Sequence, residues 1–216
     1  KSVAKIFKLK KRPSFNPLII HYKNLKILKK DVILNNVFLK LYKAFCPGPI
    51  TFVLKKNPHS KLSKMACAGK KTVAVRFPKH KVARNLLGKL NTPIAAPSAN
   101  ISSKLSPTCA KDVVEEFGNK IKLILDGGQC KFGLESTIVD LTEKPKILRH
   151  GVITMKKINK VLKRKISIGG NSSEIKAPGQ LRFHYYPGIP VEMNKKYAKK
   201  NQAFIGFGKK FKSKKN

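Results

Sequence analysis

Short apolar strands alternate with amphipathic helices along most of this 216-residue chain. Leu18–Ile20, Thr51–Leu54 and Thr72–Phe77 have the length and the β-branched or aromatic content of buried strands. Strands that alternate with helices form an α/β sheet whose connections pack on its faces. Some connections here are too short for a parallel crossover. We therefore predict a mixed sheet with flanking helices, in which Thr72, Ala74 and Arg76 share one face.

The same periodicities predict the other elements. Asp31 is the expected cap of one helix, and Ser106-Pro107 are the expected N-cap and first position of another, which Gly118 ends. The helices are expected over residues 1–12, 31–45, 79–90, 107–117 and 154–164, and further strands over 121–125, 136–141 and 147–149.

The composition divides the chain into three parts. Residues 1–166 form the predicted catalytic domain, residues 167–190 a linker, and residues 191–216 the start of a second domain with a strand over 203–208. The basic and aromatic segment Arg182–Pro187 either docks on the domain by apolar contact or acts as a lid over a ligand. Residues 1–12 show no N-cap at their start, so we expect a helix whose beginning is missing and a chain that is part of a longer protein.

Charge and cysteine content limit the classes of function and the compartment that fit the chain. The formal net charge is +38, but only six of the 48 basic residues are arginine. The lysines are spread over the whole length, which fits a compositional bias at least as well as an RNA-binding face. Because lysine is the usual basic residue of this chain, we expect each arginine at a position that needs the planar guanidinium. The four cysteines form no C-x-x-C pair and predict free thiols in a reducing, cytoplasmic compartment. No apolar run is long enough to predict a membrane span.

The stretch Pro93–Thr108 carries one charge in this basic chain, Lys104. Ser98 and Asn100 stand two residues apart, and further hydroxyls follow before a predicted helix. Such groups suit an anion such as phosphate, although a plain serine-rich turn between strand and helix fits equally well. His21, at the end of a strand, is more often structural than catalytic.

Eight motifs in register resemble the YrdC/TsaC family of threonylcarbamoyl-AMP synthases, in its longer form with a linker and a C-terminal domain. The resemblance covers residues 1–190. The motifs are KIFKLKKRPSFNPLIIH, CPGPITFVL, TVAVRFP, PIAAPSAN, SPT, ILDGG, GLESTIVDL and ILRHG, followed by the linker APGQLRFHYYPGIPV.

The resemblance implies a twisted open α/β sheet with a concave, positively charged pocket. It also implies a reaction in which L-threonine, bicarbonate and ATP, with Mg²⁺, give threonylcarbamoyl-AMP and pyrophosphate. The expected partners are these three substrates and the machinery that transfers the product to an adenosine of tRNA. Binding of tRNA or double-stranded RNA is a further expectation, and a membrane partner is not expected.

The matched motifs also carry roles. The resemblance makes Lys10 and Arg12 the catalytic pair, and it divides the other positions between two substrates. The ATP group is Arg12, Asn16, Thr72, Ser98, Asn100, Ser106, Arg149 and Tyr185, and the threonine group is His21, Arg76, Ala96, Ser136 and Thr137. No resident metal ligands are expected.

Three departures accompany the resemblance. Lys11 stands where relatives often have glycine. The family's first strand and helix, with a Thr-x-Tyr-Gly-Leu motif, have no counterpart in the sequence, and the C-terminal domain is short. Two other functions are weighed: a non-catalytic RNA-binding module, and the carbamoyl-adenylate domain of a larger carbamoyltransferase. The linker with Tyr185 favours the synthase over the second of these.

Overall fold

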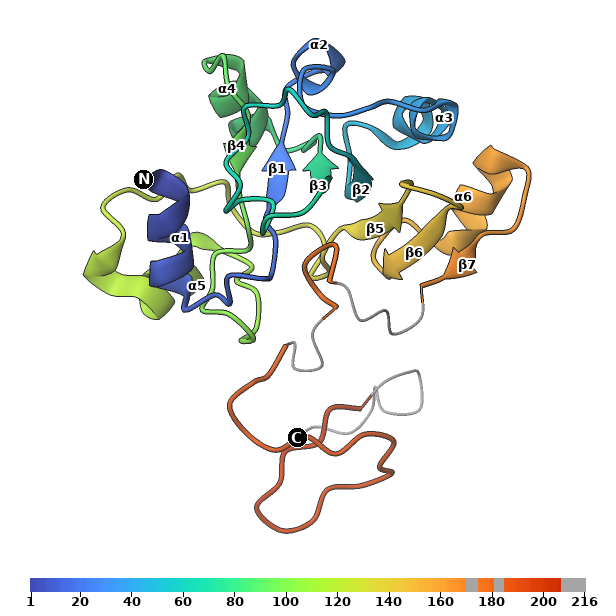
Figure 1. Cartoon of the computed structure of the whole chain (residues 1–216). Coiled ribbons are helices and arrows are strands. Elements are labelled where there is room, and N and C mark those ends of the chain that lie inside the picture. Colours follow the sequence, from blue (N-terminus) through green and yellow to red (C-terminus); the bar gives the residue numbers. More distant parts are fainter. Residues whose placement is uncertain (170–174, 181–184, 207–216) are drawn as a thin grey trace. The chain divides into compact units, whose positions relative to one another are not determined.

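The computed structural model describes residues 1–169, 175–180 and 185–206. The chain separates into two units, Lys1–Tyr186 and Pro187–Asn216. Within the described residues of the first unit, one seven-stranded sheet has the order β4-β1-β3-β2-β5-β6-β7 (Figure 1). The strands are β1 Ile19–His21, β2 Ile50–Lys55, β3 Thr72–Arg76, β4 Ile94–Ala95, β5 Thr137–Asp140, β6 Lys146–Arg149 and β7 Ser167–Ile168.

The strand pairing is mixed, as the short connections predict. Strand β1 runs parallel to β3, β2 parallel to β5, and β6 parallel to β7. The pairs β1–β4, β2–β3 and β5–β6 are antiparallel. The α/β fold with a mixed sheet is therefore confirmed.

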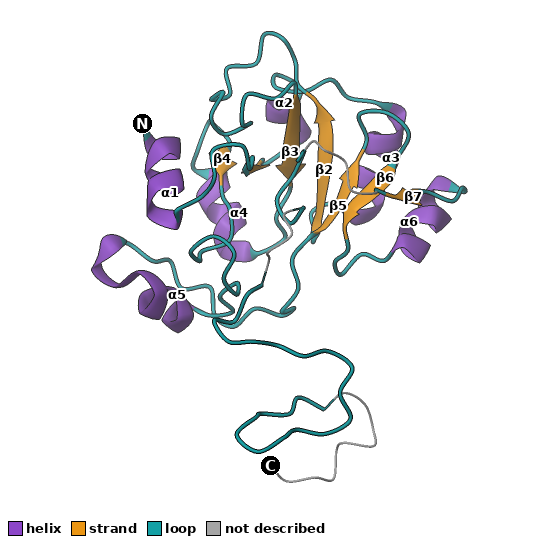
Figure 2. Cartoon of the chain, turned by 60° about the horizontal axis from the view of Figure 1, so that its bottom comes forward, coloured by secondary structure: helices purple, strands orange, loops and turns teal. Residues whose placement is uncertain are grey.

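The helices begin where side chains satisfy free backbone N–H groups. Asn24, Asn35 and Thr154 each accept a hydrogen bond from the N–H three residues on. Figure 2 shows the helices beside the strands. They are α1 Ser2–Lys10, α2 Leu25–Leu28, α3 Asn36–Phe45, α4 Lys81–Gly88, α5 Ala110–Phe117, the 3₁₀ turn Gly118–Lys120 and α6 Met155–Leu162.

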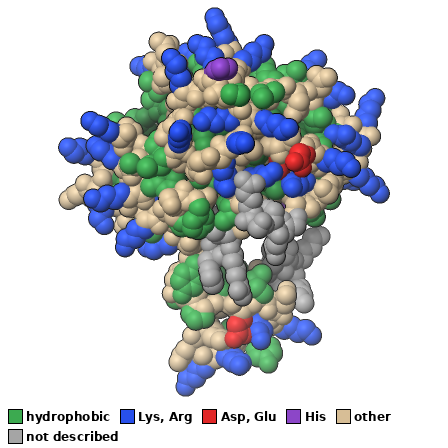
Figure 3. Space-filling model, viewed as in Figure 1, with side chains coloured by type: hydrophobic (Ala, Val, Ile, Leu, Met, Phe, Trp, Pro, Cys, Tyr) green, Lys and Arg blue, Asp and Glu red, His purple; other side chains and the backbone are tan. Residues whose placement is uncertain are grey.

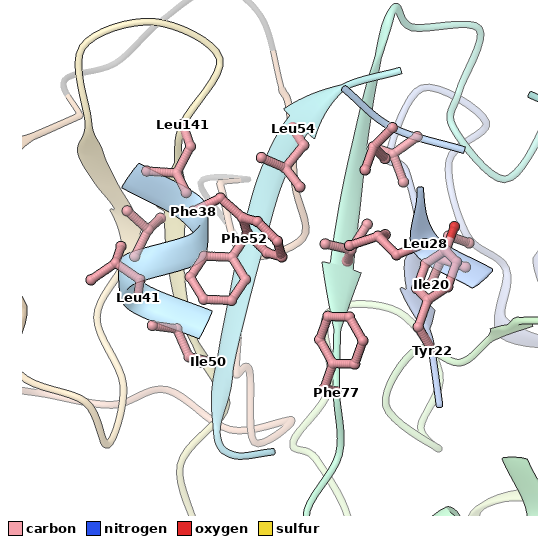
Figure 4. Close-up of a cluster of buried hydrophobic side chains, with 14 of the residues drawn as sticks. Ile20, Tyr22, Leu28, Phe38, Leu41, Ile50, Phe52, Leu54, Phe77 and Leu141 are labelled. Atoms are coloured by element: carbon pink, nitrogen blue, oxygen red, sulfur yellow. The ribbon is translucent and has the colours of Figure 1, made fainter. Parts of the chain in front are cut away.

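One face of the sheet carries the main hydrophobic core. Alternate residues of β1, β2 and β3 point into it, and α2, α3 and α6 cover it with residues that include Leu28, Phe38 and Ile158. Phe38 meets Phe52 edge to face with ring centroids 5.1 Å apart (Figure 4). Each such side chain contributes about 1.5–3 kcal/mol when fully buried, so this face supplies most of the stability.

The other face has a much smaller apolar cluster. Ile19, Val53, Ala74 and Ile138 lie there, with Ala177 packed on them from residues 175–180. The predicted alternation along Thr72–Phe77 is confirmed, because Val73, Val75 and Phe77 lie in the main core while Ala74 lies in this small cluster. Polar side chains therefore have room on this face.

The helix expected over 31–45 begins later. Asn35 caps it by accepting from Phe38 N at 2.8 Å, so α3 starts at Asn36. Asp31 is buried and accepts instead from the hydroxyls of Tyr22 at 2.9 Å and Ser60 at 2.7 Å. The prediction of Asp31 as the cap was wrong because the carboxylate is needed in this buried hydrogen-bond network.

The helix expected after Ser106-Pro107 begins at Ala110, with Cys109 as N-cap. The Asp112 carboxylate accepts from the N–H groups of Thr108 and Cys109 and fixes this start. These hydrogen bonds lower the pKa of Asp112 to about 2. Ser106 is used elsewhere, since its hydroxyl donates to Glu135 at 2.7 Å.

The strand expected over 121–125 does not form. Leu123 and Leu125 are 74% and 54% exposed, and no described strand pairs with this segment. An apolar run becomes a strand only where a neighbouring backbone completes its hydrogen-bond ladder. Residues 203–206 likewise form no strand, and residues 207–208 of that prediction lie outside the described residues. Within the described part of the chain, no helix is both long and apolar enough to cross a bilayer.

Candidate functional site

A cavity of about 380 Å³ opens on the face with the small apolar cluster. Its volume lies in the range of small-molecule sites. It is lined by Lys10 and Arg12 at the end of α1, by His21 and Arg76 of the sheet, by the loop 96–108, by residues 130–136, by Arg149 and by the turn Pro178–Gly179. Segments from the whole length of the first unit therefore meet at this cavity.

Strand register brings two of the side chains together. Strands β1 and β3 are parallel, and His21 is the direct partner of Arg76 at their carboxyl ends. Residues paired in this way project to the same face of the sheet. Ligands of open α/β sheets bind at this end of the strands.

The loop 98–104 is braced from inside by a buried lysine. The Lys10 ammonium donates to the carbonyl oxygens of Ser98 and Asn100. The Asn100 amide donates to the carbonyl oxygens of Ile101 at 3.0 Å and Lys104 at 2.8 Å. Lys10 and Asn100 thus hold the shape of the loop while Ser98 and Ser102 line the cavity.

Arg12 is fixed by its own neighbours. Its guanidinium donates to the Asn16 carbonyl at 2.9 Å, to the Asn16 side-chain oxygen at 2.7 Å and to the Pro17 carbonyl at 2.7 Å. Burial lowers the pKa of Arg12 to about 10, so the side chain stays cationic at neutral pH.

A β-bulge turns Arg149 toward the cavity. Ile138 of β5 faces Arg149, but its neighbour Val139 faces Ile147, so Leu148 is an extra residue in β6. Simple alternation would put Arg149 on the core side with Ile147. The bulge moves it to the side of Ile138, as bulges near functional sites do. Its Nε and Nη2 each donate to Ser136 at 3.0 Å.

Five cations face one carboxylate among the described residues of the lining. The cations are Lys10, Arg12, Arg76, Lys104 and Arg149, and the carboxylate is Glu135. Burial lowers the pKa of Lys10, Arg12, Arg76 and Arg149, with the pKa of Lys10 falling to about 8 through burial and the charge of Arg12. Burial, followed by Arg76, lowers the pKa of His21 to about 3 and keeps its ring neutral. Such a cavity favours an anionic ligand.

Buried polar atoms without partners point the same way. Three such side-chain atoms occur among the described residues: Arg76 Nε, Thr72 Oγ1 and Ser102 Oγ. Buried polar groups are normally hydrogen-bonded. Arg76 and Ser102 both line the cavity, so a ligand with acceptor oxygens would complement this wall.

Most of the residues expected at the site line the cavity, and three do not. Thr72 starts β3, about 13 Å along the strand from Arg76 at ~3.3 Å per residue. Thr137 points to the core side, where its hydroxyl bonds the backbone of Ile153. Tyr185 is outside the lining, but the charges of Glu135 and Arg149 act on its pKa, which burial raises. The predicted residues that do line the cavity are Lys10, Arg12, Asn16, His21, Arg76, Ala96, Ser98, Asn100, Ser106, Ser136 and Arg149.

The sequence analysis missed Glu135, Pro178 and Gly179, and it included Ser102 only among the hydroxyls after Asn100 that suit an anion. Glu135 accepts from Ser106 and lies 3.7 Å from the Arg149 guanidinium. A signal for it existed, because only ten acidic residues occur in the chain and Glu135 directly precedes Ser136. The rarity argument applied to arginine would have selected it. No sequence pattern marks the turn at Gly179 as part of the wall.

The described residues hold no cluster of three or more His, Cys, Asp or Glu side chains suited to a metal ion. The thiols of Cys46, Cys67, Cys109 and Cys130 are free, as expected.

A mixed open sheet with a cation-rich cavity at the carboxyl ends of two parallel strands defines an α/β protein whose cavity is suited to small anionic ligands. The comparison with known families is more specific. The chain belongs to the Sua5/YciO/YrdC family, whose sequence model, described as telomere recombination, matches residues 1–151. The family resemblance inferred from the motifs is therefore confirmed.

Several curated relatives are named threonylcarbamoyl-AMP synthase, two of which follow. The protein of Pyrococcus abyssi is 43% identical over 199 residues, covering 88% of this chain and 57% of the relative. The protein of Schizosaccharomyces pombe is 38% identical over 224 residues, covering 88% of this chain and 54% of the relative. The chain thus spans about half the length of these relatives.

A solved structure agrees with the fold. The crystal structure of P. abyssi Sua5 complexed with L-threonine matches with a TM-score of 0.81 and 42% identity, covering 86% of this chain and 56% of that one. The sheet and its flanking helices are therefore those of the family.

Proposed function

We propose that this chain carries the substrate site of a threonylcarbamoyl-AMP synthase. The reaction joins L-threonine and bicarbonate as a carbamate and transfers it to the AMP part of ATP, with release of pyrophosphate and water. The observation that carries the proposal is the partly buried Arg76 side chain, which lines the cavity and whose buried Nε has no partner. The relative from P. abyssi, whose structure contains L-threonine, supports this choice of ligand.

Threonine would bind over the ends of β1 and β3. The Arg76 guanidinium suits a carboxylate, because the planar fork can form two parallel hydrogen bonds. His21, kept neutral by burial and by Arg76, can exchange a hydrogen bond with the amino acid without adding charge. Ser136 presents its hydroxyl nearby, although that group also bonds Thr51 at 2.7 Å. Ala96 lines the same cavity.

The nucleotide would lie along the loop 98–106. Lys10, Arg12 and Arg149 surround the space beside this loop and can stabilise the phosphate charge that develops as the carbamate oxygen attacks the α-phosphorus and pyrophosphate leaves. Asn16, Ser98, Asn100 and Ser106 supply polar contacts. We also propose that Thr72, Thr137 and Tyr185 contribute to the site. They lie outside the lining, so they would act through the residues next to them.

Mg²⁺ fits this cavity as a companion of the nucleotide. Magnesium is commonly held by one or two carboxylates together with substrate phosphates. Glu135 is the carboxylate among the described lining residues, with the Ser106 hydroxyl 2.7 Å away. These two groups would hold the ion, which would neutralise phosphate charge.

The face of the molecule seen in Figure 3 does not favour the RNA-binding alternative. It shows lysine and arginine scattered over that face, with gaps between them. Nucleic-acid footprints gather cations on one face or stripe. Within the synthase proposal, the product passes to tRNA-modifying machinery in the cytoplasm, a compartment that the free thiols fit. We also propose the division into domain 1–166, linker 167–190 and second domain from 191.

The test is threonine-dependent release of pyrophosphate from ATP and bicarbonate. We expect release with L-threonine and none without it. Arg76→Ala should weaken threonine binding by about 10- to 100-fold, as expected when a hydrogen-bonded charged partner is lost, and weaken ATP binding far less. Arg84→Ala removes an exposed arginine outside the cavity and should change neither.

Absence of threonine-dependent pyrophosphate would contradict the proposed function. Equal losses of threonine and ATP binding in Arg76→Ala would contradict the role of Arg76. Use of carbamoyl phosphate as the substrate, in place of threonine and bicarbonate, would favour the carbamoyltransferase domain. Salt-sensitive binding of RNA of any sequence, without release of pyrophosphate, would favour the RNA-binding module.

A further inference from the structure

Residues 175–180 form a turn that is docked on the sheet. Ala177 is fully buried against Ile19, Val53 and Ala74. The Gln180 side-chain oxygen accepts from the N–H groups of Lys176 at 2.9 Å and Ala177 at 3.0 Å and closes the turn on itself. This turn is therefore a fixed part of the cavity wall.

An ion pair anchors the same turn. The Lys176 ammonium lies 3.3 Å from Oδ2 of Asp140 and 3.3 Å from the Thr142 hydroxyl. The Asp140 side chain is 1% exposed, and it also lies 4.0 Å from the ammonium of Lys146. Removal of one partner from a buried pair is costly, so the anchor holds the turn at the end of β5.

The docked turn presses a glycine against Arg149. Gly179 has φ +87°, and a Cβ placed on it would lie 2.6 Å from Cδ of Arg149 and 3.4 Å from Nη1. Arg149 has little freedom to retreat, because its Nε and Nη2 are both bonded to Ser136. Any side chain at position 179 would therefore displace the guanidinium from Ser136.

We propose that the turn 175–180 is a positioning element for Arg149 and that Gly179 is its positioning residue. The bulge in β6 turns Arg149 toward the cavity, and the backbone of Gly179 fixes its side chain beside Glu135. The guanidinium then stands between the proposed threonine contact Ser136 and the proposed nucleotide contact Ser106. This role rests on the proposed function, because it concerns how the cavity binds ATP.

The test compares two glycines with the same backbone strain. Gly188 has φ +89°, but a Cβ there would meet no atom of the described residues within 4 Å. Gly179→Ala and Gly188→Ala thus impose a similar conformational cost, and only the first touches Arg149. We expect Gly179→Ala to weaken ATP binding in calorimetry by about tenfold, as when hydrogen bonds of a charged group are lost, and Gly188→Ala by less than about twofold.

A spectroscopic readout separates positioning from general damage. The chain has six arginines, so the ¹⁵N–¹H signal of Arg149 Nε can be assigned by its disappearance in Arg149→Lys. We expect this signal to move in Gly179→Ala and to stay in place in Gly188→Ala. In the Arg149→Lys background, Gly179→Ala should cost less than about twofold in ATP affinity. Should Gly179→Ala not fold, Lys176→Met loosens the anchor without strain and should move the same signal.

The outcomes distinguish this inference from the proposed function. An unmoved Arg149 signal, or an ATP loss that is as large in Arg149→Lys as in the unmodified chain, would overturn the positioning role. A chain that binds neither ATP nor threonine, yet shows the Arg149 shift, would overturn the proposed function and leave the Gly179 contact in place.

Discussion

The two faces of the sheet come from the same strands and differ in what they bury. Toward α2, α3 and α6, alternate residues form a large apolar core that includes Phe52 and Val75. Toward the cavity, the residues between them form only a small apolar cluster. The ends of β1 and β3 carry His21 and Arg76 on this face. The first face holds the chain folded, and the second keeps charges partly desolvated where a ligand can use them.

This contrast separates stability from binding. Apolar burial is a non-directional gain that scales with area, so the core face tolerates little truncation. A buried cation without a full set of partners is a cost to the fold, so the cavity face is expected to reduce stability in return for affinity. Substitutions on the two faces should therefore affect different measurements.

The largest effect is expected on the core face. Leu54 is 0% exposed, and Leu54→Ala should lower the free energy of unfolding by about 2–5 kcal/mol, through lost burial and the cavity left behind. Urea denaturation measures this loss. The same substitution at Leu123, which is 74% exposed, should stay within about 0.5 kcal/mol. Similar losses at both positions would remove the distinction between core and surface.

Arg76→Met tests the opposite face. Threonine affinity should fall by roughly 1.5–3 kcal/mol, the range for hydrogen bonds to charged groups, as measured by calorimetry. The free energy of unfolding should fall by less than about 1 kcal/mol or rise, because a partly buried cation whose buried Nε lacks a partner is removed. A stability loss as large as that of Leu54→Ala would show that the cavity face also carries the fold.

Asn35→Ala tests the attachment of α3 to the core face. The substitution removes the cap to Phe38 N and the bond from the side-chain amide to the Leu141 carbonyl at 3.0 Å. We expect a loss of about 1–2 kcal/mol in urea denaturation. Asn24→Ala removes the exposed cap of the four-residue helix α2 and should cost less. A larger stability loss in Asn24→Ala than in Asn35→Ala would contradict the role of Asn35 in attaching α3 to the core face.

The smallest effect is a pH dependence on the cavity face. Lys10, with a pKa of about 8, is cationic below that pH and neutral above it, so ATP affinity should fall by a few-fold as pH rises through about 8. Lys10→Met should bind ATP more weakly at pH 7 and show a flatter profile. Lys8→Met, an exposed position on the same helix, should keep the wild-type profile, and an unchanged profile in Lys10→Met would refute the assignment.

The contribution of Lys10 to stability changes with pH in the opposite direction to that of a salt-bridged lysine. The pKa of Lys10 is about 8 in the folded chain, against an ordinary lysine value of 10.5. The unfolded chain therefore binds more protons between these values, and the contribution of Lys10 to stability rises with pH across this window. A lysine with a gained partner would contribute less as pH rises.

Local sequence patterns determined much of the sheet. Period-two alternation along Thr72–Phe77 assigned Ala74 and Arg76 to one face, because the pleat of a strand leaves no other choice. The short connections required a mixed sheet. The family motifs assigned Arg76 and Arg149 to the site, in agreement with the argument from the rarity of arginine. These features depend on neighbours in the chain, so they are visible without a structure.

The failures have a common physical cause. Residues 121–125 have strand composition, but a strand needs a partner backbone that composition does not supply. Asp31 has a good capping side chain, but the hydroxyls of Tyr22 and Ser60 use it. In both cases a tertiary contact outweighs a local propensity.

The sequence by itself determined the family, the mixed α/β sheet, the two faces of Thr72–Phe77 and many of the residues that line the cavity. Only the tertiary structure decided how those residues act on one another. Lys10 is linked to a loop some ninety residues away, at Ser98 and Asn100. The bulge at Leu148 reverses the face of Arg149, and Gly179 then holds that side chain in place. Register shifts and long-range packing arise from the whole fold, and for that reason local patterns do not contain them.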